Sequence, residues 1–598
     1  MFLLVNPPFA SLWRPNLGLS LLKASLSREG IESSIYYADH DLAQRLGVET
    51  YSRIHRDNEL MIGEWLFSGL VRPQGWDLGF LPWLAERQHS PAELEALERV
   101  RSGLSDFVEQ LCQRLLTYRP RMLGISSTFQ QNNAALAILR RLRQLAPELV
   151  TVMGGANLEG ELSPPLLEFD GVDFTVSGEA EHCIGPLYRL VMCFGREVPE
   201  AQLPPEVCSR RLRRPPGRGR INDLDALPHP DFDDYFASLK SHPALSDLRP
   251  TLTLEGSRGC WWGQVQHCTF CGLNGSGMNY RAKTPQRLLD EIFALTARHN
   301  CSKVDMVDNI IAPRHLKEVL PELARLQAGL EFFWEVKANL KPAHFALLAA
   351  AGVRWLQPGI ESFSDPVLHL MRKGQRAIQN LLVLKAAREN GIRLSWNILL
   401  GHPGESPEHV EEQCDLVESI AHLQPPLVCC EVRPDRFSPL FSELTDLQPF
   451  SVYTYIYGGP PERVQSLAYF FSLPVQPEPV RSNHQRSLRR LQRRVEAWQS
   501  SWSIPALRSL HLQGDAVVDQ RWPGKQQVHP LSAQEKWLLL NCSAPTRLSE
   551  LNSRAPMNSE ELGSALARLQ ARRLCYCDDQ QALSLVLSQP ASQLPALP

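Results

Sequence analysis

Short apolar runs alternate with amphipathic stretches of ten or more residues in the first third of the chain. Five of these runs predict strands: Phe2–Val5, Ser33–Tyr37, Met122–Ser126, Val150–Met153 and Val172–Ser177. Helical patterns at Gly18–Glu29 and Ala134–Ala146 lie between them, and residues 40–110 form an insertion. Strands separated by helices of this length build a parallel sheet with both faces covered. Residues 1–195 are therefore predicted to form one α/β domain.

Polar and glycine residues follow several of these runs. Ligands of open parallel sheets bind beyond the carboxyl ends of the strands, which makes these residues candidates for a binding site. They are Asn6, Ser126, Ser127, Thr128, Gly154, Gly155, Gly178 and Glu179. Each glycine has the alternative explanation that it only allows a turn after its strand.

A second alternating series occupies residues 251–445. Six runs predict strands: Thr251–Leu254, Val304–Val307, Phe332–Val336, Trp355–Gly359, Leu394–Leu399 and Val428–Val432. Helical patterns separate these runs, so the series predicts six β/α units. This pattern is typical of a partial barrel, with chemistry at the carboxyl ends of its strands.

The remaining segments have weaker patterns. Residues 196–250 are rich in proline and arginine and are expected to be a linker. Residues 446–525 are expected to be a helical extension with a basic run at 486–494. Residues 526–598 predict a small, mostly helical, winged-helix-like domain. Its expected helices are Ala533–Asn541, Leu548–Leu551 and Ser559–Arg572, followed by two short strands.

Composition limits the classes of function. The 598 residues are 43% hydrophobic and 21% charged, which is typical of globular domains. A formal net charge of −3 gives no reason to expect nucleic-acid binding. No apolar stretch approaches the ~20 residues that span a bilayer, so no membrane association is expected. Fourteen cysteines without a secretion signal indicate a reducing, cytoplasmic location.

The strongest chemical signal is a group of three cysteines directly after the first strand of the second series. Cys260, Cys268 and Cys271 have the spacing C-x7-C-x2-C in the stretch GSRGCWWGQVQHCTFCG. A structural zinc site needs four closed ligands. Three thiolates can instead hold a [4Fe–4S] cluster and leave one iron for a small molecule. The alternative is a zinc site completed by His267, although adjacent ligands at 267 and 268 are awkward for tetrahedral geometry.

This cysteine loop at the head of a β/α series resembles that of radical S-adenosylmethionine (SAM) enzymes, whose usual spacing is C-x3-C-x2-C. The four extra residues, the run Trp261-Trp262-Gly263 and the stretch 267–275 are similar to the cobalamin-binding radical SAM enzymes of the RiPP maturation C-methyltransferase family. The resemblance covers roughly residues 1–445. It implies a Rossmann-like cobalamin-binding domain followed by a partial (β/α)6 radical SAM barrel.

The resemblance also implies contacts with SAM. Phe270 occupies the position of an aromatic residue that touches the adenine, and Asp308 follows the second strand, where the SAM amino group is met. The stretch 396–405 resembles the adenine motif G-x-I-x-G-x-x-G-E, with Trp396 in place of the first glycine. Charged residues on apolar parallel strands are costly in a dry core, so those at the strand ends are expected to line the site. The further expected contacts are Glu335, Lys337, Glu361, Ser362 and Asn397.

For the cobalamin domain, the resemblance lies in Asn6-Pro7-Pro8, Asn16-Leu17-Gly18, Ser126–Thr128, Gly154–Asn157 and Ser177–Glu181. It adds Leu17, Gly18 and Asn157 to the expected cofactor contacts. The D-x-H-x-x-G pattern that supplies a histidine to cobalt is absent, and His40 is expected to lie in a surface loop. The resemblance therefore implies cobalamin without a protein histidine on cobalt. A flavodoxin-like domain with no cofactor is the alternative.

The implied activity is that of a B12-dependent methyltransferase. A 5′-deoxyadenosyl radical formed from SAM would activate an unactivated carbon of a ribosomal precursor peptide, and methylcobalamin would supply the methyl group. The implied partners are a precursor peptide or small-molecule substrate and an electron donor such as flavodoxin or ferredoxin. Two other functions stay open. One is ring formation, or transfer of the 3-amino-3-carboxypropyl group, on a small molecule, and the other is a non-catalytic zinc or nucleotide-binding module.

Overall fold

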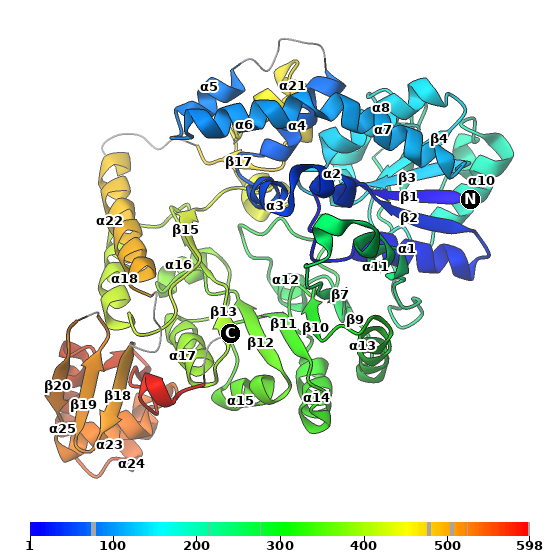
Figure 1. Ribbon diagram of the computed structural model, residues 1–598. Coiled ribbons are helices and arrows are strands. Elements are labelled where there is room, and N and C mark those ends of the chain that lie inside the picture. Colours follow the sequence, from blue (N-terminus) through cyan, green and yellow to red (C-terminus); the bar gives the residue numbers. More distant parts are fainter. Residues whose placement is uncertain are drawn as a thin grey trace.

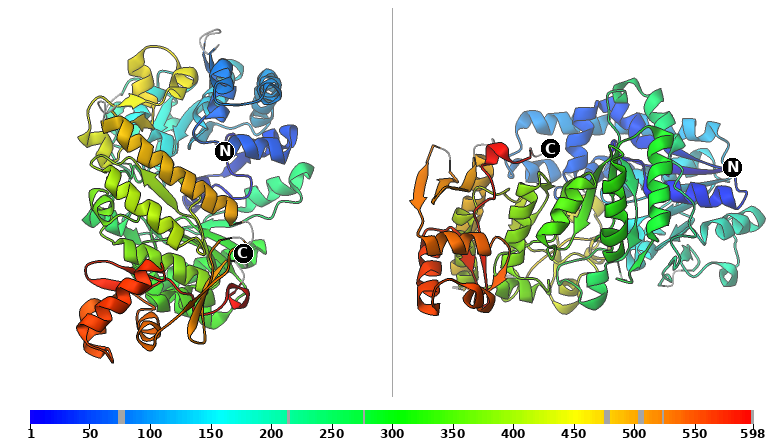
Figure 2. Two further views of the ribbon diagram at one scale, coloured as in Figure 1. Left: turned by 90° about the vertical axis from the view of Figure 1, so that its left-hand side faces the viewer. Right: turned by 90° about the horizontal axis from the view of Figure 1, so that it is seen from below.

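The computed structural model describes residues 1–72, 79–212, 215–275, 277–474, 480–502, 508–522 and 524–595. An α/β domain built on the N-terminal strands lies at one end of the molecule, and a barrel-like α/β domain follows it. A small C-terminal unit lies at the far end of the barrel from the first domain (Figures 1 and 2). Within the described residues, no helix is both long and apolar enough to cross a bilayer.

The first domain contains a six-stranded sheet with the order β2-β1-β3-β4-β5-β6. The first five strands are parallel, and they confirm the expected strands with ends shifted by at most two residues. Their bounds are β1 Phe2–Asn6, β2 Ser33–Tyr37, β3 Met122–Ser126, β4 Val150–Gly154 and β5 Phe174–Val176. Almost every residue of β1, β3, β4 and β5 is buried, because helices cover both faces of the sheet, whereas the edge strand β2 is only partly buried.

Two layers of helices cover this sheet. Helices α7 (Leu104–Thr117) and α8 (Asn132–Leu145) pack together on one face, and α1 (Leu17–Arg28) and α10 (Ile184–Phe194) pack together on the other (Figure 1). The insertion between β2 and α7 is helical. Its helices are α2 Ala38–Leu46, α3 Val48–Arg56, α4 Ile62–Val71, α5 Phe80–Ala85 and α6 Pro91–Ser102.

Residues 196–250 differ from the expected linker, because part of this segment belongs to the first domain. Strand β6 (Val207–Ser209) pairs antiparallel with β5, and helix α11 (Asp233–Ser241) packs against β2. The Asp234 carboxylate accepts the N–H of Ile35 at 2.7 Å and an ion pair from Lys23 at 2.7 Å. Short apolar runs inside a proline- and arginine-rich stretch carry too weak a pattern to reveal this pairing.

The second domain has a five-stranded parallel sheet with the order β13-β12-β11-β10-β7 and a separate parallel pair, β14-β15. The strands are β7 Leu252–Leu254, β10 Lys303–Met306, β11 Glu331–Val336, β12 Val353–Pro358, β13 Arg393–Leu394, β14 Asn397–Leu400 and β15 Val428–Glu431. The helices that connect them are α13 Pro285–His299, α14 Leu320–Leu326, α15 Pro342–Ala350, α16 Asp365–Leu370, α17 Ala377–Glu389 and α18 Pro407–Ser419. The structure confirms the six expected strand regions.

One expected strand, Leu394–Leu399, is divided into β13 and β14. The buried Trp396 sits at the division, where its ring packs between Phe363 and Trp498 at centroid distances of 5.5 and 5.9 Å. The chain changes partner there: Ser395 still bonds to Leu356, whereas β14 pairs with β15 and bridges to Glu361. A bulky buried side chain therefore marks the bend.

The segment after the barrel returns to the first domain instead of forming a separate helical extension. Its elements are α19 Pro439–Glu443, β16 Gln448–Pro449, α20 Val452–Tyr457, α21 Pro461–Leu467 and β17 Phe471–Ser472. Buried residues of α20 and α21 lie in the same hydrophobic core as the first sheet. The Tyr457 hydroxyl accepts a hydrogen bond from Asn132 at 2.9 Å. This return fixes the barrel against the first domain.

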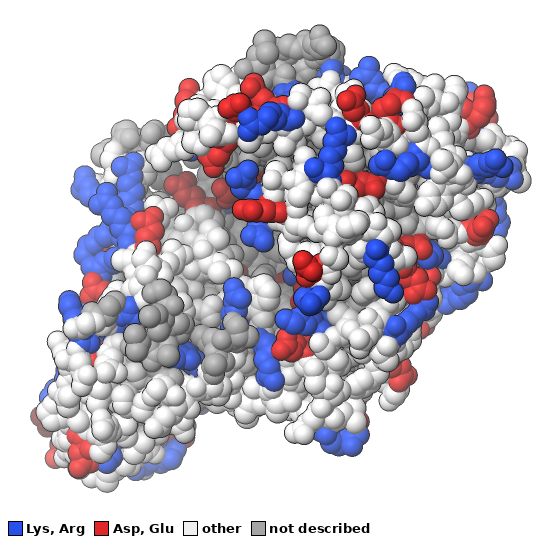
Figure 3. Space-filling model, viewed as in Figure 1, with Lys and Arg blue, Asp and Glu red and all other residues white. Residues whose placement is uncertain are grey.

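Helix α22 (Val480–Ser501) packs along α18 and leads to the C-terminal unit. Its arginines gather on the surface beside α18, where Arg490 pairs with Glu411 (Figure 3). The C-terminal unit confirms the expected helices α23 Ala533–Asn541, α24 Leu548–Arg554 and α25 Ser559–Ala571. It also contains two three-stranded sheets, formed by β18 Ser509–Gln513, β19 Ala516–Gln520 and β20 Gln527–Pro530 and by β21 Thr546–Arg547, β22 Cys575–Cys577 and β23 Gln581–Ser584.

A buried carboxylate joins the insertion to the first sheet. Glu64 of α4 accepts the backbone N–H groups of Asn132 and Asn133 at 2.6 and 2.8 Å, where α8 begins. Burial raises the pKa of Glu64 to about 7. Its two oxygens satisfy two of the N–H groups that a helix leaves unpaired at its start.

We expect Glu64→Gln to lower the free energy of unfolding by about 1–3 kcal/mol, because an amide offers one acceptor oxygen and leaves one buried N–H unpaired. The exposed Glu98→Gln on α6 is the control and should change stability by less than ~0.5 kcal/mol. The first thermal transition of each variant measures the effect. Equal midpoints for Glu64→Gln and Glu98→Gln would contradict this role of Glu64.

Candidate functional site

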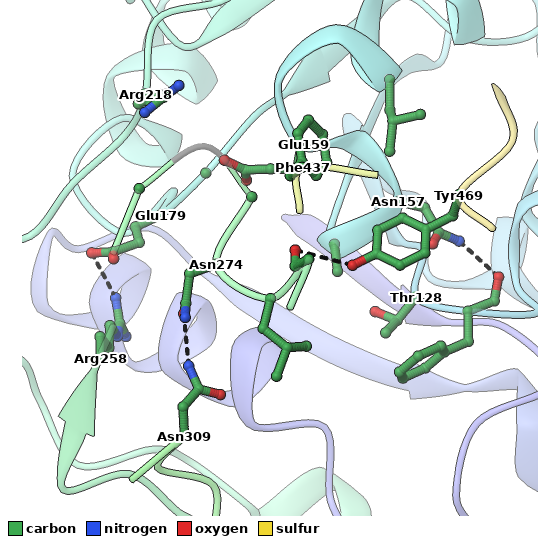
Figure 4. Close-up of a pocket in the computed structure, with 18 of the residues that line it drawn as sticks. Thr128, Asn157, Glu159, Glu179, Arg218, Arg258, Asn274, Asn309, Phe437 and Tyr469 are labelled. Atoms are coloured by element: carbon green, nitrogen blue, oxygen red, sulfur yellow. Dashed lines mark hydrogen bonds and ion pairs between the residues drawn. The ribbon is translucent and has the colours of Figure 1, made fainter. Parts of the chain in front are cut away.

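The carboxyl edges of the two sheets border one cavity of about 450 Å³. The first domain contributes Thr128, Asn157 and Glu179 from the loops after β3, β4 and β5 (Figure 4). The barrel contributes Asn274 and Asn309, whose side chains are joined by a hydrogen bond of 2.8 Å. The segment that returns to the first domain contributes Phe437 and Tyr469. The cavity is therefore built from all three parts of the chain that meet there.

A second cavity of about 350 Å³ lies within the first domain and adjoins the first, because Thr128, Gly178, Glu179 and Arg258 line both. Its walls are mostly apolar. Of the cofactor contacts expected from sequence, it is lined by Leu17, Gly18, Ser126, Thr128, Gly154, Gly155, Gly178 and Glu179. Gly155 has a φ of 109°, and a Cβ there would lie 2.4 Å from the Ser127 carbonyl oxygen, so no other residue fits this turn without a shift.

Three of the expected contacts in the first domain differ in their position. Asn157 lines the larger cavity, where its amide donates to the Phe129 carbonyl at 2.9 Å. Asn6 is buried and accepts a hydrogen bond of 2.8 Å from Asn16, the residue that caps α1. Ser127 is buried and bonds to Asn132 and Asn157, so it supports the loop from behind.

The three cysteines lie in a loop that leads directly into the larger cavity. Cys260 caps the short helix α12 (Trp261–Val265), and its Sγ accepts the Gly263 N–H at 3.3 Å. All three cysteines are half-buried. The four residues after Cys271, from Gly272 to Gly275, line the cavity. Burial raises the pKa of the Cys271 thiol to about 12, so this thiol becomes an effective ligand only when a metal centre stabilises the thiolate.

The spacing of these thiols does not fit a single zinc ion. In the described chain, the three ligand atoms that do come within 4.8 Å of one another belong to His182, Cys183 and Glu206, and not to the cysteine trio. Zn–S bonds of about 2.3 Å would bring thiolates of one ion to within about 4 Å of each other. His267 instead bonds to the backbone oxygen of Cys271 at 2.8 Å. The donor set therefore fits a larger group, such as an iron–sulfur cluster.

Asp308 supports the start of the cysteine loop. Its carboxylate accepts the N–H groups of Gly256 and Ser257, both at 2.6 Å, and the Trp334 indole N–H at 3.0 Å. It is fully buried, and burial raises its pKa to about 7. The neighbouring Asn309, and not Asp308, lines the cavity.

The charged residues at the strand ends form a group beside the cysteines. Lys337 is buried and lies 3.9 Å from the centre of the Trp262 ring, and Glu361 forms an ion pair of 3.5 Å with Lys373. The Lys373 ammonium lies 5.6 Å from the centre of the Phe270 ring. Burial, together with the charges of Asp308 and Glu361, raises the pKa of Glu335 to about 7.

Two further expected contacts lie on the neighbouring elements. Ser362 is buried and donates a hydrogen bond to Gln413 at 3.0 Å, so it supports the turn after β12. Asn397 is exposed at the start of β14, opposite Val428.

A charge network that the sequence did not reveal joins the two sheet edges. Arg258, two residues before Cys260, forms ion pairs with Glu179 at 3.0 Å, Glu181 at 2.6 Å and Glu255 at 2.8 Å. Arg281 adds a second bond to Glu179 at 2.9 Å. Figure 4 shows Arg258 and Glu179 facing each other at the border of the cavity. The signal was an arginine next to the cysteine motif, but two of its three partners, Glu179 and Glu181, lie almost 80 residues earlier in the chain.

His40 was expected in a surface loop, and this expectation is wrong. The side chain is fully buried, its Nδ1 lies 2.8 Å from the Ser238 hydroxyl, and its ring stacks on Tyr37. Ser238 belongs to α11, so the packing of the supposed linker is what buries this histidine. Within the described residues, neither cavity is lined by a histidine.

Residues 254–417 match the Radical SAM superfamily, so the chain contains a radical SAM domain. This domain implies a [4Fe–4S] cluster and SAM as cofactors. The chain is 22% identical over 346 residues to the uncharacterized methyltransferase PH0819 of Pyrococcus horikoshii, covering 57% of this chain and 73% of that protein. It is also 22% identical to the anaerobic magnesium-protoporphyrin IX monomethyl ester cyclase of Rubrivivax gelatinosus, over 56% of this chain and 61% of that protein.

Two solved structures share this fold. The cobalamin-dependent SAM radical enzyme OxsB with aqua-cobalamin bound has a TM-score of 0.55 and 15% identity, over 96% of this chain and 71% of OxsB. The radical SAM methyltransferase TsrM of Kitasatospora setae, with cobalamin and a [4Fe–4S] cluster bound, has a TM-score of 0.53 and 16% identity, over 82% of this chain and 90% of TsrM.

We expect Cys271→Ala, purified and reconstituted without oxygen, to lose nearly all bound iron and sulfide and all cleavage of SAM to 5′-deoxyadenosine. The matched control is Cys193→Ala, which removes an exposed cysteine of α10 and should leave both unchanged. Iron and sulfide analysis and chromatography of the SAM products measure these effects. Full iron content with continued 5′-deoxyadenosine formation in Cys271→Ala would refute the assignment of this ligand.

Proposed function

We propose that the protein is a cobalamin-dependent radical SAM enzyme that methylates an unactivated carbon of a ribosomally made precursor peptide. The observation that carries the proposal is the 450 Å³ cavity shared by the carboxyl edges of the two sheets. A carbon radical reacts with any nearby hydrogen donor. The substrate on which the radical forms therefore has to be enclosed between the cofactor that generates the radical and the cofactor that reacts with it. A cavity bordered by both domains supplies that arrangement.

The residues divide into three groups, one for each cofactor. Cys260, Cys268 and Cys271 would hold the cluster, and the strand-end group with Lys337 and Glu361 would meet SAM. The cobalamin would lie at the adjoining 350 Å³ cavity, which has the polar side chains of Ser126 and Thr128 at its border. When bound, these groups supply one-electron cleavage of SAM and transfer of a methyl group. The chain itself positions the substrate, and the closely packed ring of Tyr469 helps to exclude water.

The absence of a histidine at either cavity, in the part of the chain that the structure describes, supports cobalamin bound without a protein histidine on cobalt. The structures of OxsB and TsrM both contain bound cobalamin, which supports cobalamin as a cofactor. TsrM and PH0819 are described as methyltransferases, which supports methyl transfer as the reaction.

The expected product is a substrate that carries the methyl group of SAM. With SAM labelled as S-CD3, a ribosomal precursor peptide that is a substrate should gain the mass of one labelled methyl group per modification, because the methyl group passes from SAM through the cobalamin. Mass spectrometry of the reconstituted reaction measures this gain. An unlabelled cyclised product, or a product that carries the 3-amino-3-carboxypropyl group, would contradict methylation.

The C-terminal unit offers a place for the peptide. Strand β20 pairs with β19 on one side only, and its Val528 is 58% exposed. An open strand edge with exposed apolar side chains can bind an extended peptide as an additional strand. The unit itself is firmly docked, since Lys385 of α17 bonds to the Ser584 carbonyl at 2.9 Å. The alternative is that the C-terminal unit only packs against the barrel as a lid and does not bind the peptide.

Val528→Glu should weaken binding of the leader part of that peptide at least tenfold, because the charge has to be desolvated when a strand is added. Leu326→Glu, an exposed leucine on the outside of α14, is the matched control and should bind like the unchanged protein. Fluorescence anisotropy of the labelled synthetic leader measures the affinity. Equal affinities of Val528→Glu and Leu326→Glu would contradict the proposed role of β20 in peptide recognition.

A further inference from the structure

The cysteine loop is four residues longer than the usual radical SAM spacing, and the structure reveals what the additional length builds. The loop forms helix α12, which carries Trp261 and Trp262. The Trp261 indole donates to the Ile311 carbonyl and the Trp262 indole donates to the Arg372 carbonyl, each at 3.1 Å. The two rings therefore anchor the loop to two different neighbours, one after β10 and one after α16.

The Trp262 ring is seated against a glycine. Gly374 has a φ of 58°, and a Cβ at this position would lie 2.1 Å from the ring. The Lys337 ammonium also lies on this ring. It is 3.9 Å from the ring centre, which is within the range of a cation–π interaction. Lys337 further donates to the Lys373 carbonyl and, at 3.2 Å, to the Gln375 side chain. The position of this ammonium is thus fixed from three sides.

A second buried ammonium lies beside it. Lys373 pairs with Glu361 at 3.5 Å and lies 5.6 Å from the centre of the ring of Phe270, the residue before Cys271. Lys337 lies on the ring of Trp262, two residues after Cys260, so both ammonium groups contact the cysteine loop. Two buried cations with one carboxylate between them are costly unless another anionic group compensates the remaining charge. Three thiolates that carry an iron–sulfur cluster are such a group.

We propose that the lengthened loop is an electrostatic device: Trp262 holds Lys337 in place so that Lys337 and Lys373 stabilise the reduced, more negative form of the cluster. The step is the uptake of one electron from an external one-electron donor protein, and no bond forms or breaks in it. Trp262 is a positioning residue, because it acts through Lys337. The inference rests on the cluster that the radical SAM domain implies, and it does not depend on the substrate or on methyl transfer.

The test compares midpoint potentials of the cluster, measured by titration with EPR detection in the absence of SAM. Trp262→Leu and Lys337→Met should each shift the potential to more negative values, because each weakens the positive charge near the cluster. The double variant should shift no further than Lys337→Met alone. Lys337→Arg keeps the positive charge and should therefore have a midpoint potential close to that of the unchanged protein.

Trp261→Leu is the matched control, because it removes the neighbouring ring and its indole bond, whereas the cation–π contact with Lys337 belongs to Trp262. Iron and sulfide per chain are measured for every variant, so loss of the cluster is distinguished from a shift of its potential. An unchanged potential in Trp262→Leu with full iron content, or an equal shift in Trp261→Leu, would overturn the proposal. If Trp262→Leu does not assemble the cluster, equal potentials of Lys337→Met and Lys337→Arg would overturn it. A change in SAM affinity without a change in potential would also overturn the proposal, and would leave Lys337 with the SAM contact proposed above.

Discussion

The structure depends on how two sheet edges are held face to face. Arg258 stands where they meet and pairs with Glu179 and Glu181 of the first domain and with Glu255 of the barrel. The planar guanidinium group of a partly buried arginine fixes the direction of each hydrogen bond. Its three carboxylate partners are therefore positioned by bond direction as well as attracted by charge. Because Arg258 lies two residues before Cys260, the same network positions the start of the cysteine loop.

A second constraint comes from the chain path. After leaving the barrel, residues 450–471 re-enter the core of the first domain, so the two domains share buried apolar side chains. Polar bonds from Asn132 and Asn133 to α20 add direction to this contact. Domains joined only by a linker move relative to one another. Here the shared core and the Arg258 network together keep the cavity between the domains at a fixed shape, which radical chemistry requires.

The sequence predicted what depends on local pattern. Apolar runs such as Met122–Ser126 became strands with the expected bounds, and the cysteine spacing identified the radical SAM domain. It did not predict features that depend on distant partners. Strand β6, the return of α20 and α21 to the first core, and the burial of His40 beneath α11 each need a contact between residues far apart in the chain. The sequence did not reveal the pairing of Arg258 with Glu179 and Glu181 for the same reason.

In the function proposed here, the cluster and the cobalamin face one another across the shared cavity. EPR spectroscopy of protein loaded with both groups, with the cluster reduced and the cobalt as Co(II), tests this arrangement directly. We expect the two paramagnetic centres to broaden or split each other's signals through magnetic coupling. A spectrum of fully loaded protein that equals the sum of the spectra of the two separate centres would contradict this arrangement.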